Sequence, residues 1–387
     1  MADRVYLDWN ATTPLRPEAR AAMAAAFDVS GNPSSVHSEG RAARKLIEDA
    51  RGTVAVAVGA DPRSVVFTSG GTEANALALT PGLRRGGRGP AQRLIVSAIE
   101  HPSVLAGGRF AQDAIEIAPV LPSGVIDLER LAAALASGPP ALVSVMLANN
   151  ETGAIQPVPE VAALVHEAGG ILHVDAVQAF LKIPINIKAL DADVLTVSAH
   201  KIGGPKGVGA AVAADGLEGL PAQVRGGGQE QGRRAGTENV AGIAGFGAAV
   251  RAAAGSMDVD AARMKALQAR LESGLRDHRD TVIFSDTAPR LPNTTLVSAL
   301  GLKAETAVIG FDLEGIAVSS GSACSSGKAQ PSHVLQAMKA DPGLLLGAIR
   351  LSLGWDSTEA DIDRCLEAWR KLSGVLRKAH AIGLERF

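Results

Sequence analysis

Five reactive side chains follow two short apolar segments in the middle of the chain. Residues 171–174 and 194–199 have the length and the β-branched content of buried strands. The side chains at their ends are Asp175, Gln178, Ser198, His200 and Lys201. Ligands of an open α/β sheet bind at the carboxyl ends of its strands. We therefore expect these five groups to share one crevice.

The combination of an amine and a carboxylate suits one cofactor in particular. Pyridoxal phosphate (PLP) requires a lysine that forms a Schiff base, and a carboxylate that keeps its pyridine nitrogen protonated. Lys201 and Asp175 are the candidates for these two roles. Either residue alone is more often a solvated lysine or a turn aspartate. Their position at two neighbouring strand ends favours the cofactor site.

Two glycine-rich segments are candidates for holding a phosphate. Residues 69–75 (SGGTEAN) follow a predicted strand, and their glycines let the backbone approach a ligand at a helix start that favours anions. Gly71 and Thr72 would supply donors there, although such turns are also common simply as tight turns. The second segment, 226–237, offers Thr237.

Three further residues lie in patterns that favour chemistry, each with a plainer alternative. His101 follows the predicted strand 93–98 and is either an acid/base and ring-stacking group or a hydrogen-bonded turn residue. Cys324 lies in a run of small polar residues, which predicts an accessible thiol or a linker with an incidental cysteine. Arg350 lies on an apolar strand, where it would bind a substrate carboxylate or form an internal salt bridge.

The composition excludes several classes of protein. The chain has 387 residues, 47% of them hydrophobic and 20% charged, so it can bury a large core and is not predicted to be disordered. A formal charge of −2 provides no basic surface for nucleic acid. The first residues lack the apolar core of a secretion signal, and no apolar run reaches membrane-spanning length. Two cysteines make no disulfide framework, and no metal site is predicted, so we expect a cytoplasmic protein without a membrane segment.

Strands and helices alternate up to residue 171, which predicts an α/β fold with a mainly parallel doubly wound sheet. Helices are expected over 17–27 and 38–58, and a long amphipathic helix from Asp258 leads into mixed strands and helices. We assign a large domain to 15–257, and a smaller α+β domain to 1–14 plus 258–387. In the last helix Cys365 lies on the apolar face and is expected to be an inert core residue.

The order and spacing of ten motifs resemble those of a known family. The chain is similar to bacterial cysteine desulfurases of the NifS/IscS type, which are class V aminotransferases of PLP fold-type I, over nearly its whole length. The motifs are YLDWNATTP, GNPSSVH, VVFTSGGTEAN, EHPSV, NNETG, HVDAVQ, SAHKIGGPKG, RAGTEN, SSGSACSS and IRLSLG. The SSGSAC motif resembles that of the first desulfurase subgroup, whose cysteine loop is longer.

The resemblance implies a role for each candidate residue. Lys201 would be the Schiff-base lysine, Cys324 the nucleophile, and His101 a ring-stacking group that takes part in proton transfer. Asn150 and Arg350 would orient the substrate. The remaining cofactor ligands implied by the resemblance are Gly71, Thr72, Asn150, Asp175, Gln178, Ser198, His200 and, from the other subunit of a homodimer, Thr237.

The implied reaction removes sulfur from L-cysteine, giving L-alanine and a persulfide on Cys324. The sulfur would pass to an acceptor protein such as an iron–sulfur scaffold. The chain lacks the longer C-terminal tail of some relatives, so molybdenum cofactor synthesis and tRNA thiolation stay open as destinations. Alternative activities are a selenocysteine lyase, another class V aminotransferase, or a catalytically silent sulfur carrier.

Overall fold

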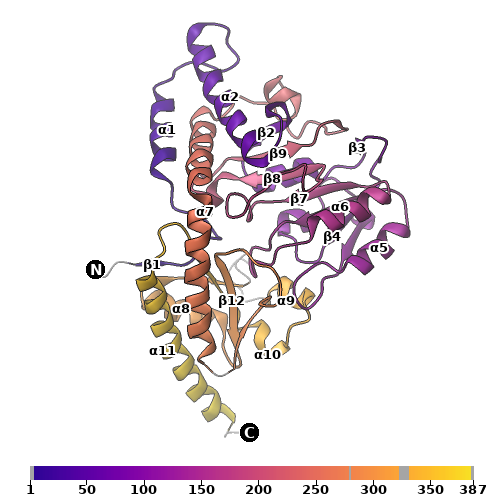
Figure 1. Cartoon of the computed structure of the whole chain (residues 1–387). Coiled ribbons are helices and arrows are strands. Elements are labelled where there is room, and N and C mark those ends of the chain that lie inside the picture. The colour runs from indigo at the N-terminus through magenta and orange to yellow at the C-terminus, as the bar shows by residue number, and fades with distance from the viewer. Residues whose placement is uncertain (1–3, 279, 322–330, 385–387) are drawn as a thin grey trace.

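Seven strands form the central sheet of the protein (Figure 1). The computed structural model describes residues 4–278, 280–321 and 331–384. Strands β8, β7, β6, β4 and β5 pair in parallel, whereas β9 runs antiparallel to both β8 and β2. This arrangement confirms the predicted mainly parallel α/β sheet. In sheet order the strands are β2 (Val65–Thr68), β9 (Gly209–Ala213), β8 (Val194–Ser198), β7 (Ile171–Asp175), β6 (Ala141–Met146), β4 (Arg93–Ser97) and β5 (Ile115–Ala118).

Helices cover both faces of this sheet because its strands are apolar on both sides. Val143 packs into the cluster with α2, α5, α6 and α7, and the adjacent Leu142 packs into the cluster on the opposite face with α3 and α4. The predicted helices 17–27 and 38–58 are confirmed as α1 and α2. The helices of this part are α1 (Pro17–Phe27), α2 (Ser38–Val58), α3 (Gly71–Ala78), α4 (Pro102–Leu105), α5 (Leu128–Ala136), α6 (Val158–Glu167) and α7 (Val240–Arg276). A separate two-stranded ribbon pairs β3 (Arg84–Arg85) with β10 (Leu217–Glu218).

Helix α7 runs along both sheets and begins at Val240, well before the expected start at Asp258 (Figure 1). Glycines hide its first half from a propensity argument, yet they permit close packing. A Cβ added to Gly245 would lie 2.6 Å from Cγ of Met23 in α1, and one added to Gly247 would lie 2.7 Å from Cβ of Ala50 in α2. Within the described ranges, α7 is the one helix long and apolar enough to cross a membrane. However, 56% of its most apolar window is buried inside the protein, as in a core helix.

A second sheet of four strands lies beside the C-terminal half of α7 and has its own apolar core (Figure 1). The first half of α7 packs into the core of the large sheet, and its residues from Met264 onward pack into the second core. The proposed division of the chain at 257/258 stays a prediction. The N-terminal β1 (Val5–Tyr6) joins this region by pairing with β13 (Ile316–Ala317). The other elements are β11 (Thr281–Ile283), β12 (Thr294–Ala299), β15 (Ile349–Ser352), β14 (Ser319–Ser320), α8 (Ala304–Leu313), α9 (His333–Ala337), α10 (Pro342–Leu345) and α11 (Glu359–Leu384).

Cys365 lies on the buried face of α11, as predicted. Its side chain is 0% exposed, and burial raises the pKa of the thiol to about 12. The helix starts with a capping box, in which Thr358 N donates to Asp361 Oδ2 (2.9 Å) and Asp361 N donates back to Thr358 Oγ1 (3.3 Å). The thiol is therefore a core group and not a reactive one.

Asp193 fixes the two central strands at the end opposite to the predicted site. Its carboxylate is fully buried and accepts from Leu172 N (2.7 Å) at the start of β7. It also accepts from the side chains of Arg85, Arg88 and His166. These bonds outweigh burial, the largest single influence, and hold the pKa of Asp193 well below its usual value. The beginnings of β7 and β8 are thereby joined through one charge.

Replacing this carboxylate should destabilise the protein in a pH-dependent way. We expect Asp193→Asn to lower the free energy of unfolding at pH 7 by about 3–5 kcal/mol, because two arginines lose a buried partner. The contribution is complete above the unfolded pKa of 3.8 and is lost as the pH falls through the lower folded value, so the difference should shrink in acid. Urea unfolding at pH 7 and at pH 3 measures both.

The neighbouring Asp191 provides a matched control. It contacts the same His166, but its side chain is 59% exposed. Asp191→Asn should therefore cost no more than about 1 kcal/mol. Equal losses in the two variants at pH 7 would contradict the role given to Asp193.

Candidate active site

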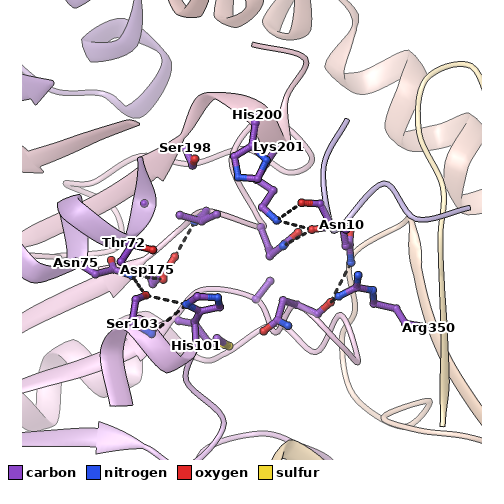
Figure 2. A pocket seen from close by; sticks show the side chains of 17 residues that line it. Asn10, Thr72, Asn75, His101, Ser103, Asp175, Ser198, His200, Lys201 and Arg350 are labelled. Atoms are coloured by element: carbon purple, nitrogen blue, oxygen red, sulfur yellow. Dashed lines mark hydrogen bonds between the residues drawn. The ribbon is translucent and has the colours of Figure 1, made fainter. Parts of the chain in front are cut away.

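A cavity of ≈ 320 Å³ lies at the carboxyl ends of β7 and β8 (Figure 2). Its walls come from both of these strand ends, from the start of α3, from the N-terminal segment and from β15. The structure thus brings together most of the residues predicted for the site. Those that line the cavity are Gly71, Thr72, His101, Asn150, Asp175, Gln178, Ser198, His200, Lys201 and Arg350.

Asp175 is the last residue of β7 and presents its carboxylate to the cavity. It is 6% exposed. Its Oδ1 accepts from Val177 N (2.9 Å), and its Oδ2 accepts from Asn75 Nδ2 (2.8 Å). Because both oxygens already have donors, the carboxylate is held in one orientation. It can face a positively charged ring nitrogen without moving.

Lys201 follows β8 in a short 3₁₀ turn, Ala199–Lys201, and extends toward the N-terminal segment (Figure 2). Its Nζ donates to the carbonyl oxygens of Asn10 (2.6 Å) and Ala11 (2.8 Å). The Asn10 carbonyl also accepts from Gln178 Nε2 (3.0 Å). Backbone carbonyls far away in the sequence therefore position the amine at the cavity.

A buried hydroxyl without a hydrogen-bond partner lies beside the start of α3. Ser198 Oγ is buried and has no hydrogen-bond partner among the described residues. A Cβ added to Gly71 would lie 3.6 Å from the Ser198 Cβ, so this hydroxyl is beside the first turn of α3, where Thr72 also lies. Burial, followed by the charges of Lys201 and Lys206, lowers the pKa of His200 to about 4. Hydroxyls, backbone amides and a neutral imidazole thus surround a place suited to an anion.

His101 lines the opposite wall and is held by Ser103. Its Nδ1 lies 2.8 Å from Ser103 Oγ and accepts from Ser103 N (3.1 Å). Burial lowers the pKa of the imidazole, and the charges of Lys201 and His333 add to this, whereas Asp175 opposes it. His101 therefore has the predicted turn role as the cap of α4, and it also lines the cavity; its role as an acid/base and ring-stacking group stays a prediction.

Arg350 forms the internal salt bridge that was one of its two predicted roles, and it also lines the cavity. Its Nη2 donates to Asp8 Oδ1 (2.8 Å), which is the internal salt bridge, and its Nη1 donates to the Asn150 carbonyl (3.1 Å). Its Nε is buried with no partner among the described residues. The guanidinium lines the cavity with unused donor capacity, so it can still receive a carboxylate.

Two predicted residues are not placed in this cavity. Thr237 is exposed and does not line it in a single chain. Cys324 lies outside the described residues, so its predicted role as nucleophile stays a prediction.

Sequence reasoning missed several polar residues that hold the site together. Asn75 and Ser103 join Asp175 to His101, and Asn10 and Lys182 join Lys201 to Gln178. Glu151 is nearly fully buried, accepts from Ser332 Oγ (2.5 Å), and has its pKa raised by burial to about 7. All five lie within or close to the quoted motifs, which was the available signal, but their partners are distant in sequence.

The residues present fit PLP. The amine, the buried carboxylate and the anion-binding corner lie on separate walls of one cavity. The strongest observation for this fit is the Ser198 hydroxyl, which is buried without a hydrogen-bond partner among the described residues. Burying a hydroxyl in this way costs free energy unless a ligand supplies the missing partner. A phosphate at the start of α3 would supply it. Lys201, Asp175, Ser198 and Thr72 would then hold the aldehyde, ring nitrogen and phosphate ends of the group.

Comparison with known proteins agrees with this fit. The family model described as aminotransferase class-V matches residues 5–365. The chain is similar to a cysteine desulfurase of Cereibacter sphaeroides, with 44% identity over 391 residues, covering 99% of both chains. It is also similar to the cysteine desulfurase IscS of Dictyoglomus turgidum, with 39% identity over 382 residues, covering 97% of this chain and 96% of the relative.

Solved structures show the same relationship. The fold is similar to that of a NifS-like protein from Rickettsia africae, with a TM-score of 0.87 and 37% sequence identity, covering 96% of this chain and 99% of the other. Another NifS-like protein gives a TM-score of 0.85 at 34% identity. Since these matches span nearly the full length, the chain belongs to the aminotransferase class-V family and, within it, to the cysteine desulfurases.

Proposed function

We propose that the chain uses PLP in the described cavity to remove sulfur from L-cysteine, giving L-alanine and a persulfide on Cys324. The observation that carries the proposal is the position of Lys201, Asp175 and the unpartnered Ser198 hydroxyl on the walls of one cavity. A structure described as SspA in complex with cysteine supports the choice of substrate; it has 28% identity and a TM-score of 0.75, and the match covers 92% of this chain.

PLP, when bound, acts as an electron sink that makes the Cα–H bond of an attached amino acid acidic. Lys201 then takes the Cα proton on Nζ, which lies at the cavity between the Asn10 and Ala11 carbonyls. Val177 N and Asn75 Nδ2 hold the Asp175 carboxylate in one orientation, in which it would pair with the pyridine nitrogen of the bound cofactor.

Arg350 binds the α-carboxylate of the substrate through its unused donors. The Asp8 bond and the Asn150 carbonyl hold the guanidinium plane in place, so that the carboxylate is oriented as well as attracted. His101 lines another wall of the same cavity. The substrate is thereby held between Arg350 and the strand ends.

Cys324 completes the reaction as the sulfur acceptor. Its thiolate attacks the substrate sulfur, a sulfur–sulfur bond forms, and the bond between that sulfur and Cβ breaks. The electron pair of the broken bond passes to the carbon skeleton, which gains a proton and leaves as alanine. The sulfur atom stays on Cys324 as a persulfide until a reductant or an acceptor thiol removes it.

The wider setting is part of the same proposal. Thr237 is exposed in one chain, which suits contact with the phosphate corner of a second copy in a homodimer. We propose a cytoplasmic enzyme that delivers its persulfide sulfur to an acceptor protein, with an iron–sulfur scaffold as the first candidate. Sedimentation would test the dimer, and sulfur transfer to purified scaffold would test the acceptor.

The products provide the first test. Purified protein incubated with L-cysteine and a thiol reductant should release sulfide and alanine in equal amounts, because each turnover produces one of each. Sulfide by a colorimetric assay and alanine by chromatography give the ratio. Pyruvate in place of alanine, or an amino-group transfer without sulfide, would contradict a desulfurase.

Loss of the acceptor thiol should separate PLP binding from sulfur transfer. Cys324→Ala should keep PLP but lose sulfide release by at least ~100-fold, because the nucleophile is gone. Cys365→Ala is the matched control: it should keep kcat, since that thiol is in the core, and lose stability only. Normal sulfide release by Cys324→Ala would remove Cys324 from the mechanism.

Loss of the amine should abolish covalent attachment of the cofactor. After borohydride reduction of the PLP-loaded protein, mass mapping should locate PLP on residue 201 in the wild type and nowhere in Lys201→Ala. The exposed Lys188→Ala should behave as wild type. PLP attached to another lysine in the wild type would refute the assignment.

A further inference from the structure

Asn75 lies at the centre of a buried hydrogen-bond network that joins two walls of the cavity (Figure 2). It is 1% exposed on α3. Its Nδ2 donates to Asp175 Oδ2 (2.8 Å) and to Ser103 Oγ (2.9 Å), and its Oδ1 accepts from Thr196 Oγ1 (2.6 Å). Both amide hydrogens and the amide oxygen are therefore used.

The direction of the amide follows from its partners. The Asp175 carboxylate can only accept, so the NH₂ group of Asn75 must face it and Oδ1 must face Thr196. The single hydroxyl hydrogen of Thr196 is then used by Asn75. His173 Nε2, which lies 3.2 Å from Thr196 Oγ1, must therefore carry a hydrogen. Burial lowers the pKa of His173 to about 4, so its ring is neutral and carries one hydrogen. A single hydrogen on Nε2 is consistent with the donor directions assigned to Asn75 and Thr196.

The same reasoning determines the state of His101. Ser103 Oγ accepts from Asn75, and its one hydrogen is then free to point at His101 Nδ1, 2.8 Å away. Ser103 N donates to the same Nδ1 (3.1 Å). With two donors directed at it, Nδ1 is an acceptor, so a neutral ring carries its hydrogen on Nε2, the nitrogen turned away from Ser103.

We propose that Asn75 is a positioning residue that couples Asp175 to His101 and holds His101 as a neutral hydrogen-bond donor through Nε2. A nitrogen that already carries hydrogen cannot take a proton, so His101 polarises a group in the cavity and Lys201 alone moves the Cα proton. The inference rests on the proposed function for its catalytic meaning, but the tautomer itself does not depend on turnover.

The charges around His101 agree with a neutral ring. Asp175 at the end of β7 favours the imidazolium, whereas Lys201 after β8 and His333 on α9 disfavour it. Burial is the largest influence and lowers the pKa of the ring. Protonation of the ring would also place a hydrogen on Nδ1 directly against the Ser103 N–H. The hydrogen-bond geometry and the electrostatics therefore both favour the neutral ring.

Nitrogen NMR of the full-length, PLP-loaded protein labelled with ¹⁵N-histidine tests the proposal. His101, assigned through a His101→Gln variant, should show hydrogen on Nε2 in the wild type at neutral pH. In Asn75→Ala the Ser103 hydroxyl becomes free to turn and Asp175 loses a donor. His101 should then exchange between tautomers and titrate at a higher pH than in the wild type, and kcat should fall by roughly 10-fold.

Two further variants make the result decisive. Ser103→Ala removes the hydroxyl that links Asn75 to His101, so it should also allow His101 to exchange between tautomers. This variant replaces Asn75→Ala in the test if Asn75→Ala does not fold. Asn186→Ala, in an exposed turn, should leave the His101 signals unchanged. Hydrogen on Nδ1 in the wild type, or unchanged signals in a folded Asn75→Ala or Ser103→Ala, would overturn the proposal. A protein without desulfurase activity but with the expected signals would instead refute the proposed function alone.

Discussion

The parallel pairing of β7 with β8 is the constraint on which the site depends. Asp175 pairs with Thr196 in this ladder, so the two strands end almost level. A level end places the carboxylate of one strand and the amine that follows the other on the same edge of the sheet. Asp193 joins the opposite ends of the same strands through a buried charge. The backbone register of β7 and β8 therefore places Asp175 and the turn that carries Lys201 at the same edge of the sheet.

Several buried polar side chains lie at this edge of the sheet. Around the cavity Asn75, Thr196, His173 and Asp175 are all nearly or fully buried. Each of these has a partner within the protein, which keeps its desolvation cost low. Ser198 Oγ and Arg350 Nε have none among the described residues. These two residues line the cavity, where the phosphate and the carboxylate of the ligands are expected.

The sequence patterns predicted many of the side chains that line the cavity, but not the polar residues that hold these side chains in place. Asp175 and Lys201 were predictable because each follows a strand whose composition is unambiguous. Asn75 was not, because a buried asparagine on a short helix has no local pattern; its meaning comes from Asp175 and Thr196, about a hundred residues further on. The first half of α7 was missed for a related reason, since Gly245 and Gly247 lower helix propensity while the contacts with α1 and α2 that require them are distant. In both cases, contacts with residues distant in sequence determine the structure, and local propensity does not reveal them.

The N-terminal segment shows why the cavity needs both sheets. The backbone carbonyl of Asn10 accepts from Lys201 and Gln178 of the large sheet. Its side chain donates to Thr294 Oγ1 and accepts from Asn293, both in the second sheet region, and it also accepts from Lys182. A shift of one sheet against the other would thus move the carbonyl that positions the catalytic amine. Arg350 would move with it, because Arg350 reaches the cavity from β15 and its Asp8 partner lies in the same N-terminal segment. Placement of the amine and of the substrate carboxylate is therefore coupled through residues 8–11, which are far from both in sequence.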